Sequence, residues 1–229
     1  MANRPIFIPN KINKPFVTEQ NIEFKWIPGM AVSQKMKNVK SLHKAVLENQ
    51  NIRDILEIST KSELELGIRL SAFNLRLNFE NGKKITVEAA FQGSKVFEHG
   101  GPYRNLYLMS GREIKKDERL KQSGVLIGFN YQNEKWPLEP KTAFYDWLYL
   151  KALCENKSLS DKLMSFAGFS DIEFNPKKSL NCQARSAALY LAIYNKVNLS
   201  DLLRDKNKFI KELYLQFNPK IKAKQNTLF

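Results

Sequence analysis

A carboxylate, an amide and an amine recur at short intervals in one stretch of the chain, residues 85–97 (ITVEAAFQGSKVF). If this stretch is helical, Glu88, Gln92 and Lys95 fall within one narrow stripe, because each residue turns a helix by about 100°. The ring of Phe91 lies in the same stripe. Such a surface suits a polar ligand that carries a flat base. The alternative is a solvated helix face on which a loose acid–base pair has no chemical role.

The residues around this stripe predict the elements that hold it. The β-branched run 85–87 predicts an extended lead-in, after which the sequence favours a helix with Thr86 as its N-cap. Asn81-Gly82 stands between two alternating segments and predicts a type I′ hairpin that feeds this helix. We expect a longer, kinked strand over 66–77 before the hairpin.

The loop that follows the stripe carries two adjacent glycines. Gly100 and Gly101 allow positive φ angles and a close backbone approach, which suits a diphosphate, and Tyr103 follows them. On its own, a Gly-Gly-Pro-Tyr run is more often a simple turn. His99 has the chemistry of a general acid, although loop histidines are more often bystanders. The loop is therefore a candidate through its place beside the predicted helix.

The remaining pattern predicts a single α+β domain that is mainly helical and has a small antiparallel sheet. Helices are expected over 32–49, 110–122, 141–155, 159–166, 181–194 and 199–215, and further strands over 22–26, 54–59 and 124–130. Three prolines in residues 1–20 indicate an extended N-terminal arm, and residues 217–229 have the composition of a basic tail. The domain itself is expected to span residues 21–216.

Length and charge narrow the class of partner. A chain of 229 residues with 43% hydrophobic residues can bury one sizeable core and is not a disordered tail. Its 37 Lys and Arg against 23 Asp and Glu give a formal charge of +14, which favours nucleic acid, a nucleotide or an anionic membrane surface. Because Lys far outnumbers Arg, the surplus is also compatible with a generally lysine-rich proteome.

Cysteine and histidine usage argues against a disulfide or a metal site. Cys154 and Cys182 have no CxxC spacing and are expected to be reduced core residues. Since the histidines are His43 and His99 alone, we expect neither a metal centre nor a cofactor. No apolar run is long enough to span a membrane, and the N-terminus does not resemble a signal peptide. A cytoplasmic monomer is therefore expected.

Polar residues in the second half supply further candidates. Asp171 and Glu173 point in opposite directions if their segment is extended, so only one of them can face a pocket. Helix 181–194 is apolar almost all round after its first turn and is expected to be the buried helix against which the stripe helix packs. Asn181, Gln183 and Arg185, near its N-terminal end, are suited to hold ligand oxygens.

Residues 70–97, LSAFNLRLNFENGKKITVEAAFQGSKVF, resemble the signature of the NADAR family. Glu88, Gln92 and Lys95 match the family's Glu, Gln and Lys, whereas Ala89 replaces the usual His, and the usual Asp-x-x-Trp-Gly segment is missing. The resemblance is closest to the branch encoded beside DarT-type toxins, which ADP-ribosylate guanine in DNA. It extends over nearly the whole chain, through FKWIPGMAVSQK, GGPY, WPLEPKTAFYDWLY and FNPKKSLNCQARSAAL.

The resemblance implies a site for ADP-ribose and a set of residues that form it. The catalytic residues would be Glu88, Lys95, Asp171 and Lys35, and the substrate-binding residues Phe73, Asn74, Phe91, Gln92, Gly100, Gly101, Tyr103, Trp147, Asn181 and Arg185. An acidic residue of this region contributes to the family's site, and we assign Asp171 to that role in preference to Glu173. Trp147 is at the same time a natural core residue, and Lys35 can instead be solvated.

The implied activity is removal of ADP-ribose from guanine in DNA, by an antitoxin to a DarT-like toxin. Cleavage of an N-glycosidic bond passes through an oxocarbenium-like state, which needs a carboxylate and a proton donor. Glu88 can supply the carboxylate, and Asp171 an auxiliary base or a ribose anchor. Lys95 can orient the ribose or, if burial depresses its pKa, attack C1″. The expected partners are ADP-ribosylated DNA, preferably single-stranded, the product ADP-ribose, and the toxin.

Two other classes of function fit the same sequence. The charge alone would suffice for a DNA-binding module without catalysis, and an antitoxin can also act by binding its toxin directly. A related enzymatic reading is N-glycosidase action on phosphorylated riboflavin-pathway intermediates, which other members of the family resemble. Turnover of ADP-ribosylated DNA distinguishes the ADP-ribosyl glycohydrolase from the DNA-binding module, the toxin-binding antitoxin and the riboflavin-pathway N-glycosidase.

Overall fold

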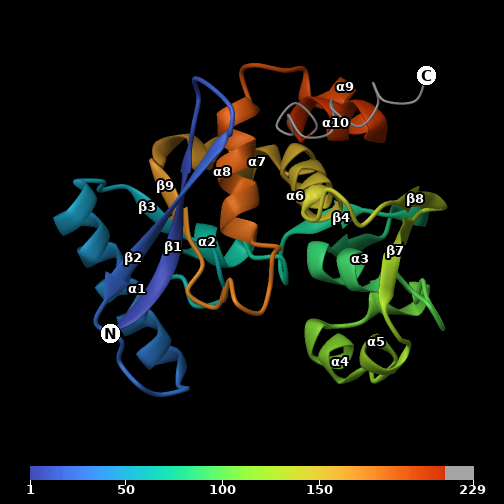
Figure 1. Cartoon of the computed structure of the whole chain (residues 1–229), viewed down its shortest axis with the longest axis horizontal. Coiled ribbons are helices and arrows are strands. Elements are labelled where there is room, and N and C mark those ends of the chain that lie inside the picture. The colour runs from blue at the N-terminus through green and yellow to red at the C-terminus, as the bar shows by residue number, and fades with distance from the viewer. Residues whose placement is uncertain (215–229) are drawn as a thin grey trace, which may run out of the picture.

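Figure 1 shows the computed structural model of the chain, which describes residues 1–214. The helices are α1 (Val32–Gln50), α2 (Glu65–Leu70), α3 (Val87–Gly93), α4 (Gly111–Lys116), α5 (Arg119–Gln122), α6 (Ala143–Glu155), α7 (Lys157–Ser160), α8 (Gln183–Ile193), α9 (Leu199–Arg204) and α10 (Lys206–Leu213), with 3₁₀ turns η1 (Glu80–Gly82), η2 (Arg104–Leu108) and η3 (Asp161–Ser165). The strands are β1 (Ala2–Pro9), β2 (Val17–Phe24), β3 (Ile55–Glu57), β4 (Arg76–Asn78), β5 (Lys84–Thr86), β6 (Lys95–Phe97), β7 (Leu126–Tyr131), β8 (Glu134–Trp136) and β9 (Gly168–Ser170). The predicted basic tail, 217–229, lies outside the described residues.

The strands form three small sheets. The largest has the order β2-β1-β9-β3, with β3 parallel to β9 and the other two pairings antiparallel. β4 and β5 form a hairpin, and β6, β7 and β8 form an antiparallel sheet beside α3. The α+β class is therefore confirmed, but the single antiparallel sheet is replaced by three sheets, of which the largest is mixed.

The predicted N-terminal arm is instead part of the largest sheet. β1 pairs along its whole length with β2, and on its other edge Ile6 and Phe7 pair with Ser170 and Phe169 of β9. Ile6 and Phe7 are both fully buried, because the sheet is covered on both faces at this point. The prolines suggested an arm, but β1 and β2 form a hairpin close in sequence, and only the second pairing of β1, with β9, joins segments more than 150 residues apart. Residues 1–20 thus belong to the domain.

α6 and α8 form the centre of the fold. Every residue from Ala143 to Leu150 in α6 is buried, including the charged Asp146, so this part of the helix is enclosed on all sides. α8 is buried as predicted, apart from Arg185. α6 packs against both α8 and α3, and it therefore links them where we expected α3 to pack on α8 directly. Figure 1 shows α8 in the middle, with the largest sheet and α1 on one side and α3 to α5 on the other.

The region before α3 differs from the predicted long strand. Residues 66–77 contain most of α2, a turn and the start of β4. A Cβ atom on Gly67 would lie 2.0 Å from the carbonyl oxygen of Glu57, so α2 can pack closely on the end of β3. The predicted hairpin is confirmed between β4 and β5, with Asn81 at φ 55° and Gly82 at φ 71°.

Two predicted helices are divided by acidic residues. Ser110 caps α4 as expected, and it forms a full capping box with Glu113. The predicted helix 110–122 nevertheless breaks at Asp117, whose carboxylate accepts from Arg119, and α5 starts there. In the same way Asp205 ends α9 and caps α10 by accepting from two backbone N–H groups. Hydrophobic periodicity continues across such breaks and does not reveal them.

Candidate active site

Two adjoining cavities lie between α3 and the segment that leads into α8. The first, which we call the acidic cavity, has a volume of about 420 Å³. It is lined by Ser59, Thr60, Lys61, Ala72, Phe73, Glu88, Lys115, Tyr145, Asp171, Glu173, Phe174, Asn175, Lys178, Ser179, Asn181 and Gln183. The second, the lysine cavity, has about 590 Å³ and is lined by Phe91, Gln92, Lys95, Leu126, Phe129, Leu138, Glu139, Lys141, Pro176, Lys177, Lys178, Ser179, Leu180 and Asn181. Lys178, Ser179 and Asn181 line both, so the two form one composite site.

Glu88 enters the acidic cavity from the first turn of α3. The start of this helix is fixed as predicted, because the Thr86 hydroxyl accepts from the N–H of Ala89. The Glu88 N–H donates to the carbonyl of Ala72 (2.9 Å), and its carboxylate accepts from the Gln92 amide (3.0 Å). Burial raises the pKa of Glu88, and the Gln92 hydrogen bond and the charge of Lys95 only partly oppose this effect.

Lys95 does not belong to the helical stripe that the spacing predicted. α3 ends at Gly93, and Lys95 begins β6, where it pairs with Phe129. Its ammonium nevertheless lies 5.1 Å from the centre of the Phe91 ring and lines the lysine cavity. Burial lowers the pKa of Lys95, and the charge of Glu88 acts in the opposite direction. The three polar residues are thus brought together, although by a helix and a strand.

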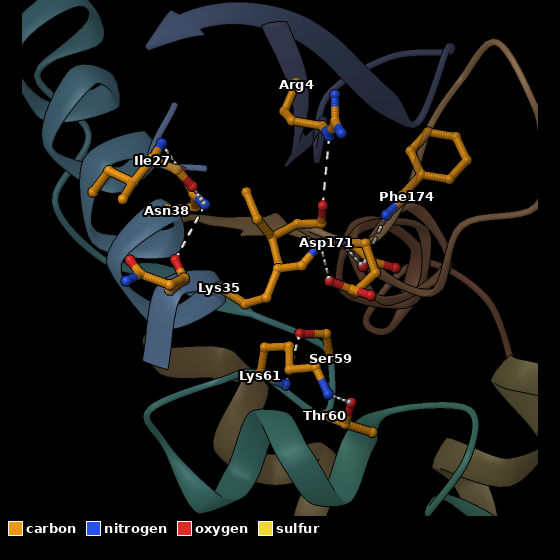
Figure 2. A network of polar contacts seen from close by, with 12 residues as sticks. Arg4, Ile27, Lys35, Asn38, Ser59, Thr60, Lys61, Asp171 and Phe174 are labelled. Atoms are coloured by element: carbon orange, nitrogen blue, oxygen red, sulfur yellow. Dashed lines mark hydrogen bonds and ion pairs between the residues drawn. The ribbon is translucent and has the colours of Figure 1, made fainter. Parts of the chain in front are cut away.

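Asp171 lies on the far side of the acidic cavity and is buried. One carboxylate oxygen accepts from the backbone N–H groups of Glu173 (3.0 Å) and Phe174 (3.2 Å), the second of which is drawn in Figure 2. The other oxygen accepts from Gln183 of α8 (2.9 Å). The oxygen of the same Gln183 amide accepts from the Ala72 N–H (2.6 Å). Ala72 therefore connects the two acids, since its carbonyl holds the start of α3.

The surroundings of Asp171 keep its carboxyl protonated at neutral pH. Burial raises its pKa to about 8, and the neighbouring carboxyl of Glu57 adds to the effect. Glu57 is itself buried, with its pKa raised by burial, and accepts from Ser59, Ser170 and the Ile172 N–H. A neutral carboxylic acid facing a cavity can donate a proton, whereas the ordinary ionised form cannot.

This protonation predicts a pH dependence of stability. In the unfolded chain Asp171 loses its proton near the ordinary value of 3.8, but in the folded chain only near 8. Its stabilising contribution is therefore complete below about pH 4 and lost as the pH rises towards about 8, with a slope of up to about 1.4 kcal/mol per pH unit. Urea unfolding should accordingly show a free energy of unfolding that falls from pH 5 to pH 8, within about that limit. Asp171→Asn should flatten this dependence; parallel curves for the two proteins would contradict the assignment.

Glu173 and Lys35 lie at the rim. Both acids line the acidic cavity, where we expected only one to face it, but Asp171 is buried and Glu173 is half-exposed. Its carboxylate forms an ion pair with Lys35 (3.1 Å), whose ammonium also lies 5.4 Å from the centre of the Trp26 ring. Lys35 lines neither cavity; it reaches the site through Glu173.

Aromatic rings and one unpaired amide complete the lining. The rings of Phe91 and Tyr145 pack edge-to-face, with their centres 5.2 Å apart. Phe73, which is half-buried, also lines the acidic cavity. The side-chain oxygen of Asn181 is buried, lines both cavities, and has no hydrogen-bond partner within the described part of the chain. A buried acceptor of this kind is suited to a donor group of a ligand.

The Gly-Gly loop does not line either cavity. Gly101 has φ 80°, and a Cβ atom there would lie 2.2 Å from the carbonyl oxygen of Lys95. At Gly100 a Cβ atom would lie 2.1 Å from the Tyr103 hydroxyl, which is hydrogen-bonded to Ser123. The glycines are thus required for close packing behind β6. We therefore no longer assign a diphosphate contact to Gly100, Gly101 or Tyr103.

Three other predicted substrate contacts lie elsewhere. Asn74 is exposed and donates to the carbonyl of Ile68 at the end of α2 (2.8 Å). Trp147 is a core residue whose indole N–H donates to the carbonyl of Leu203 (2.9 Å). Arg185 pairs with the buried carboxylate of Asp146 (2.6 Å), away from both cavities. None of these three side chains therefore lines the candidate site: Asn74 is at the surface, Trp147 is in the core, and Arg185 is held by an ion pair.

Several residues of the site were not predicted. Tyr145 and Lys115 line the acidic cavity, and Glu57 lies behind it, whereas Gln183, which also lines the cavity, was among the residues expected at the start of α8. The charge of Lys115 lowers the pKa of Glu88 and so acts on it directly. Gln183 was visible as a polar residue opening an apolar helix. The others carry no signal, because their proximity to Glu88 or Asp171 arises from tertiary packing.

Comparison with known protein families identifies one that covers almost the whole chain. The model of the DarT1-associated NADAR antitoxin family matches residues 2–223, and the chain belongs to this family. The family's description supports an antitoxin role and a toxin as partner. No curated protein matches the chain.

Two further observations concern residues 1–214. Within this part, no helix is long and apolar enough to cross a membrane. It also contains no group of three or more His, Cys, Asp and Glu side chains that could hold a metal ion. Cys154 and Cys182 are both free thiols.

Proposed function

We propose that this chain is an ADP-ribosyl glycohydrolase that removes ADP-ribose from guanine in DNA and thereby reverses the action of a DarT-like toxin. The observation that carries the proposal is that Glu88 and the buried Asp171 line one cavity, where burial raises the pKa of both carboxyl groups. Both acids are held by hydrogen bonds through Ala72 and Gln183. Glycosidases generally cleave their bond with a pair of carboxyl groups, one as acid and the other as base or nucleophile, and we assign the acid role to Asp171.

The two acids would divide the chemistry between them. As the bond between ribose C1″ and the guanine nitrogen breaks, positive charge develops on the sugar and negative charge on the base. Glu88 would stabilise the sugar cation or activate water at C1″. Asp171 would donate its proton to the departing guanine, because one of its oxygens accepts only from Gln183 and has room for that proton.

Lys95 and the rings would position the ligand. The adenine or guanine base fits against Phe91, and the free oxygen of Asn181 accepts from a base or ribose donor. Burial lowers the pKa of Lys95, which favours its neutral amine, and this amine would capture the sugar at C1″. Lys35, which is ion-paired with Glu173, would approach the ligand from the rim of the acidic cavity.

The proposal is tested by turnover in the absence of toxin. A single-stranded oligonucleotide carrying one ADP-ribosylated guanine is incubated with a hundredfold smaller amount of the protein. We expect complete conversion to unmodified oligonucleotide. Conversion that stops at one equivalent, or protection without conversion, would favour a binding antitoxin. Faster cleavage of a phosphorylated riboflavin-pathway intermediate would favour the other enzymatic reading.

The salt dependence of binding should differ between ADP-ribosylated DNA and free ADP-ribose. The formal charge of +14 predicts that binding of ADP-ribosylated single-stranded DNA weakens steeply with salt, with a logarithmic slope of roughly −0.7 for each phosphate contacted. Free ADP-ribose should show a much weaker dependence. Titrations at a series of salt concentrations measure both slopes, and equal slopes would mean that the DNA backbone does not touch the protein.

A further inference from the structure

A third hollow, which we call the α4 groove, adjoins the acidic cavity on the side of α4. It has a volume of about 550 Å³ and is lined by Thr60, Phe73, Gly111, Arg112, Lys115 and Lys116. Thr60, Phe73 and Lys115 also line the acidic cavity, so the two hollows are continuous. A polymer whose reactive unit occupies the acidic cavity can therefore leave it through this groove.

The ring of Phe73 lines both the acidic cavity and the α4 groove. A Cβ atom on Gly111 would lie 2.6 Å from this ring, so the glycine lets the ring lie directly on the backbone at the start of α4. The ammonium of Lys115 lies 5.0 Å from the ring centre. The ring is half-buried, which leaves part of it open to a ligand. An aromatic surface beside a cation is suited to stacking a nucleobase.

The positive charge of α4 is not neutralised locally. Glu113, the acid of this helix, is used by the capping box with Ser110. Asp117 is paired with Arg119 (2.6 Å). Within residues 1–214 no ion pair engages any of the three basic residues of the groove, which are Arg112, Lys115 and Lys116. The groove therefore offers uncompensated cations next to an open ring.

We propose that the α4 groove binds the stretch of single-stranded DNA adjoining the modified guanine, with one base stacked on Phe73 and backbone phosphates beside Arg112 and Lys116. The choice of DNA as occupant rests on the proposed function. A single strand is required, because bases in a duplex are stacked on one another and cannot offer a free face to the ring. The groove would thus set which side of the guanine must carry a neighbouring nucleotide.

The test uses a fluorescent, unmodified oligo-dT, so it does not depend on hydrolysis. Binding is followed by anisotropy over a range of salt concentrations. The double variant Arg112→Gln/Lys116→Gln should bind more weakly, and the magnitude of its salt slope should fall by about 1.4, or 0.7 for each lost phosphate contact. Phe73→Leu should weaken binding about tenfold without changing the slope, because stacking releases no counterions.

The matched control is Lys208→Gln/Lys211→Gln on α10, which also removes two exposed positive charges. In Figure 1, α10 lies at the top of the molecule and α4 at the bottom. The control should keep the wild-type salt slope.

Equal weakening of both double variants, or wild-type binding by the α4 double variant, would overturn the proposal. If the α4 variant bound DNA normally but lost its association with a toxin, the groove would be a protein-docking surface instead. An inactive wild type that still binds through α4 would refute the proposed hydrolysis but not the groove.

Discussion

Glu88→Gln is expected to abolish most hydrolysis while leaving the fold intact. Loss of an essential acid or base lowers a rate by about two to four orders of magnitude, and we expect a loss in this range. The exchange is isosteric, and the new amide oxygen can still accept from Gln92. Because burial raises the pKa of Glu88, its ionised form already costs stability at neutral pH, and a neutral side chain should not lower the melting temperature.

Single-turnover rates with an ADP-ribosylated oligonucleotide measure the effect, and thermal unfolding checks the fold. Glu48→Gln on the exposed face of α1 is the matched control and should retain the wild-type rate. A folded Glu88→Gln variant with nearly full activity would show that Glu88 only supports the structure.

The second large effect concerns Lys95, for which Lys95→Arg is the most informative change. Arginine keeps the positive charge but does not lose its proton in proteins, so it cannot act as a nucleophile. If Lys95 attacks C1″, activity should fall by about two orders of magnitude or more, as for loss of a covalent catalyst. If Lys95 only attracts phosphate or orients the ribose, arginine should retain much of the rate.

Borohydride distinguishes the two roles directly. The neutral amine of Lys95 would form a bond to C1″ while the bond to guanine breaks, and opening of the ribose ring would give an imine. Borohydride reduces this imine to a stable secondary amine, and water would otherwise release ADP-ribose. We expect mass spectrometry to place the trapped ADP-ribose on Lys95.

Lys35→Arg serves as the control for this experiment. Its ion pair with Glu173 can persist, and Lys35 lines neither cavity, so the yield of adduct should change little. An adduct on Lys35 would reverse the assignment. No adduct from active wild-type protein, together with an active Lys95→Arg variant, would indicate direct hydrolysis by Glu88 and Asp171.

The sequence located this site better than it located the elements around it. Glu88, Gln92 and Phe91 could be predicted because one short helix with a recognisable cap carries them. Lys95 was assigned to the correct neighbourhood for the wrong reason, since β6 and not the helix places it there. Glycines 100 and 101 illustrate the opposite error: a pattern that suits phosphate binding serves close packing.

What could not be predicted depends on contacts between distant segments. The protonation of Asp171 follows from burial and from Glu57, which is more than a hundred residues earlier in the chain. The place of β1 inside the largest sheet depends on its pairing with β9, and the place of Arg185 depends on its ion pair with Asp146. Local patterns do not encode such partners, so polar residues that look alike in the sequence end in a cavity or in the core.

The most direct test of the account is the identity of the two products. Wild-type protein is incubated with a single-stranded oligonucleotide that carries one ADP-ribosylated guanine, and both products are weighed by mass spectrometry. We predict an oligonucleotide with intact, unmodified guanine together with free ADP-ribose, and no such release by Glu88→Gln. An oligonucleotide that keeps its ADP-ribose or a fragment of it, or that has lost the guanine base, would contradict cleavage of the bond between ribose and guanine.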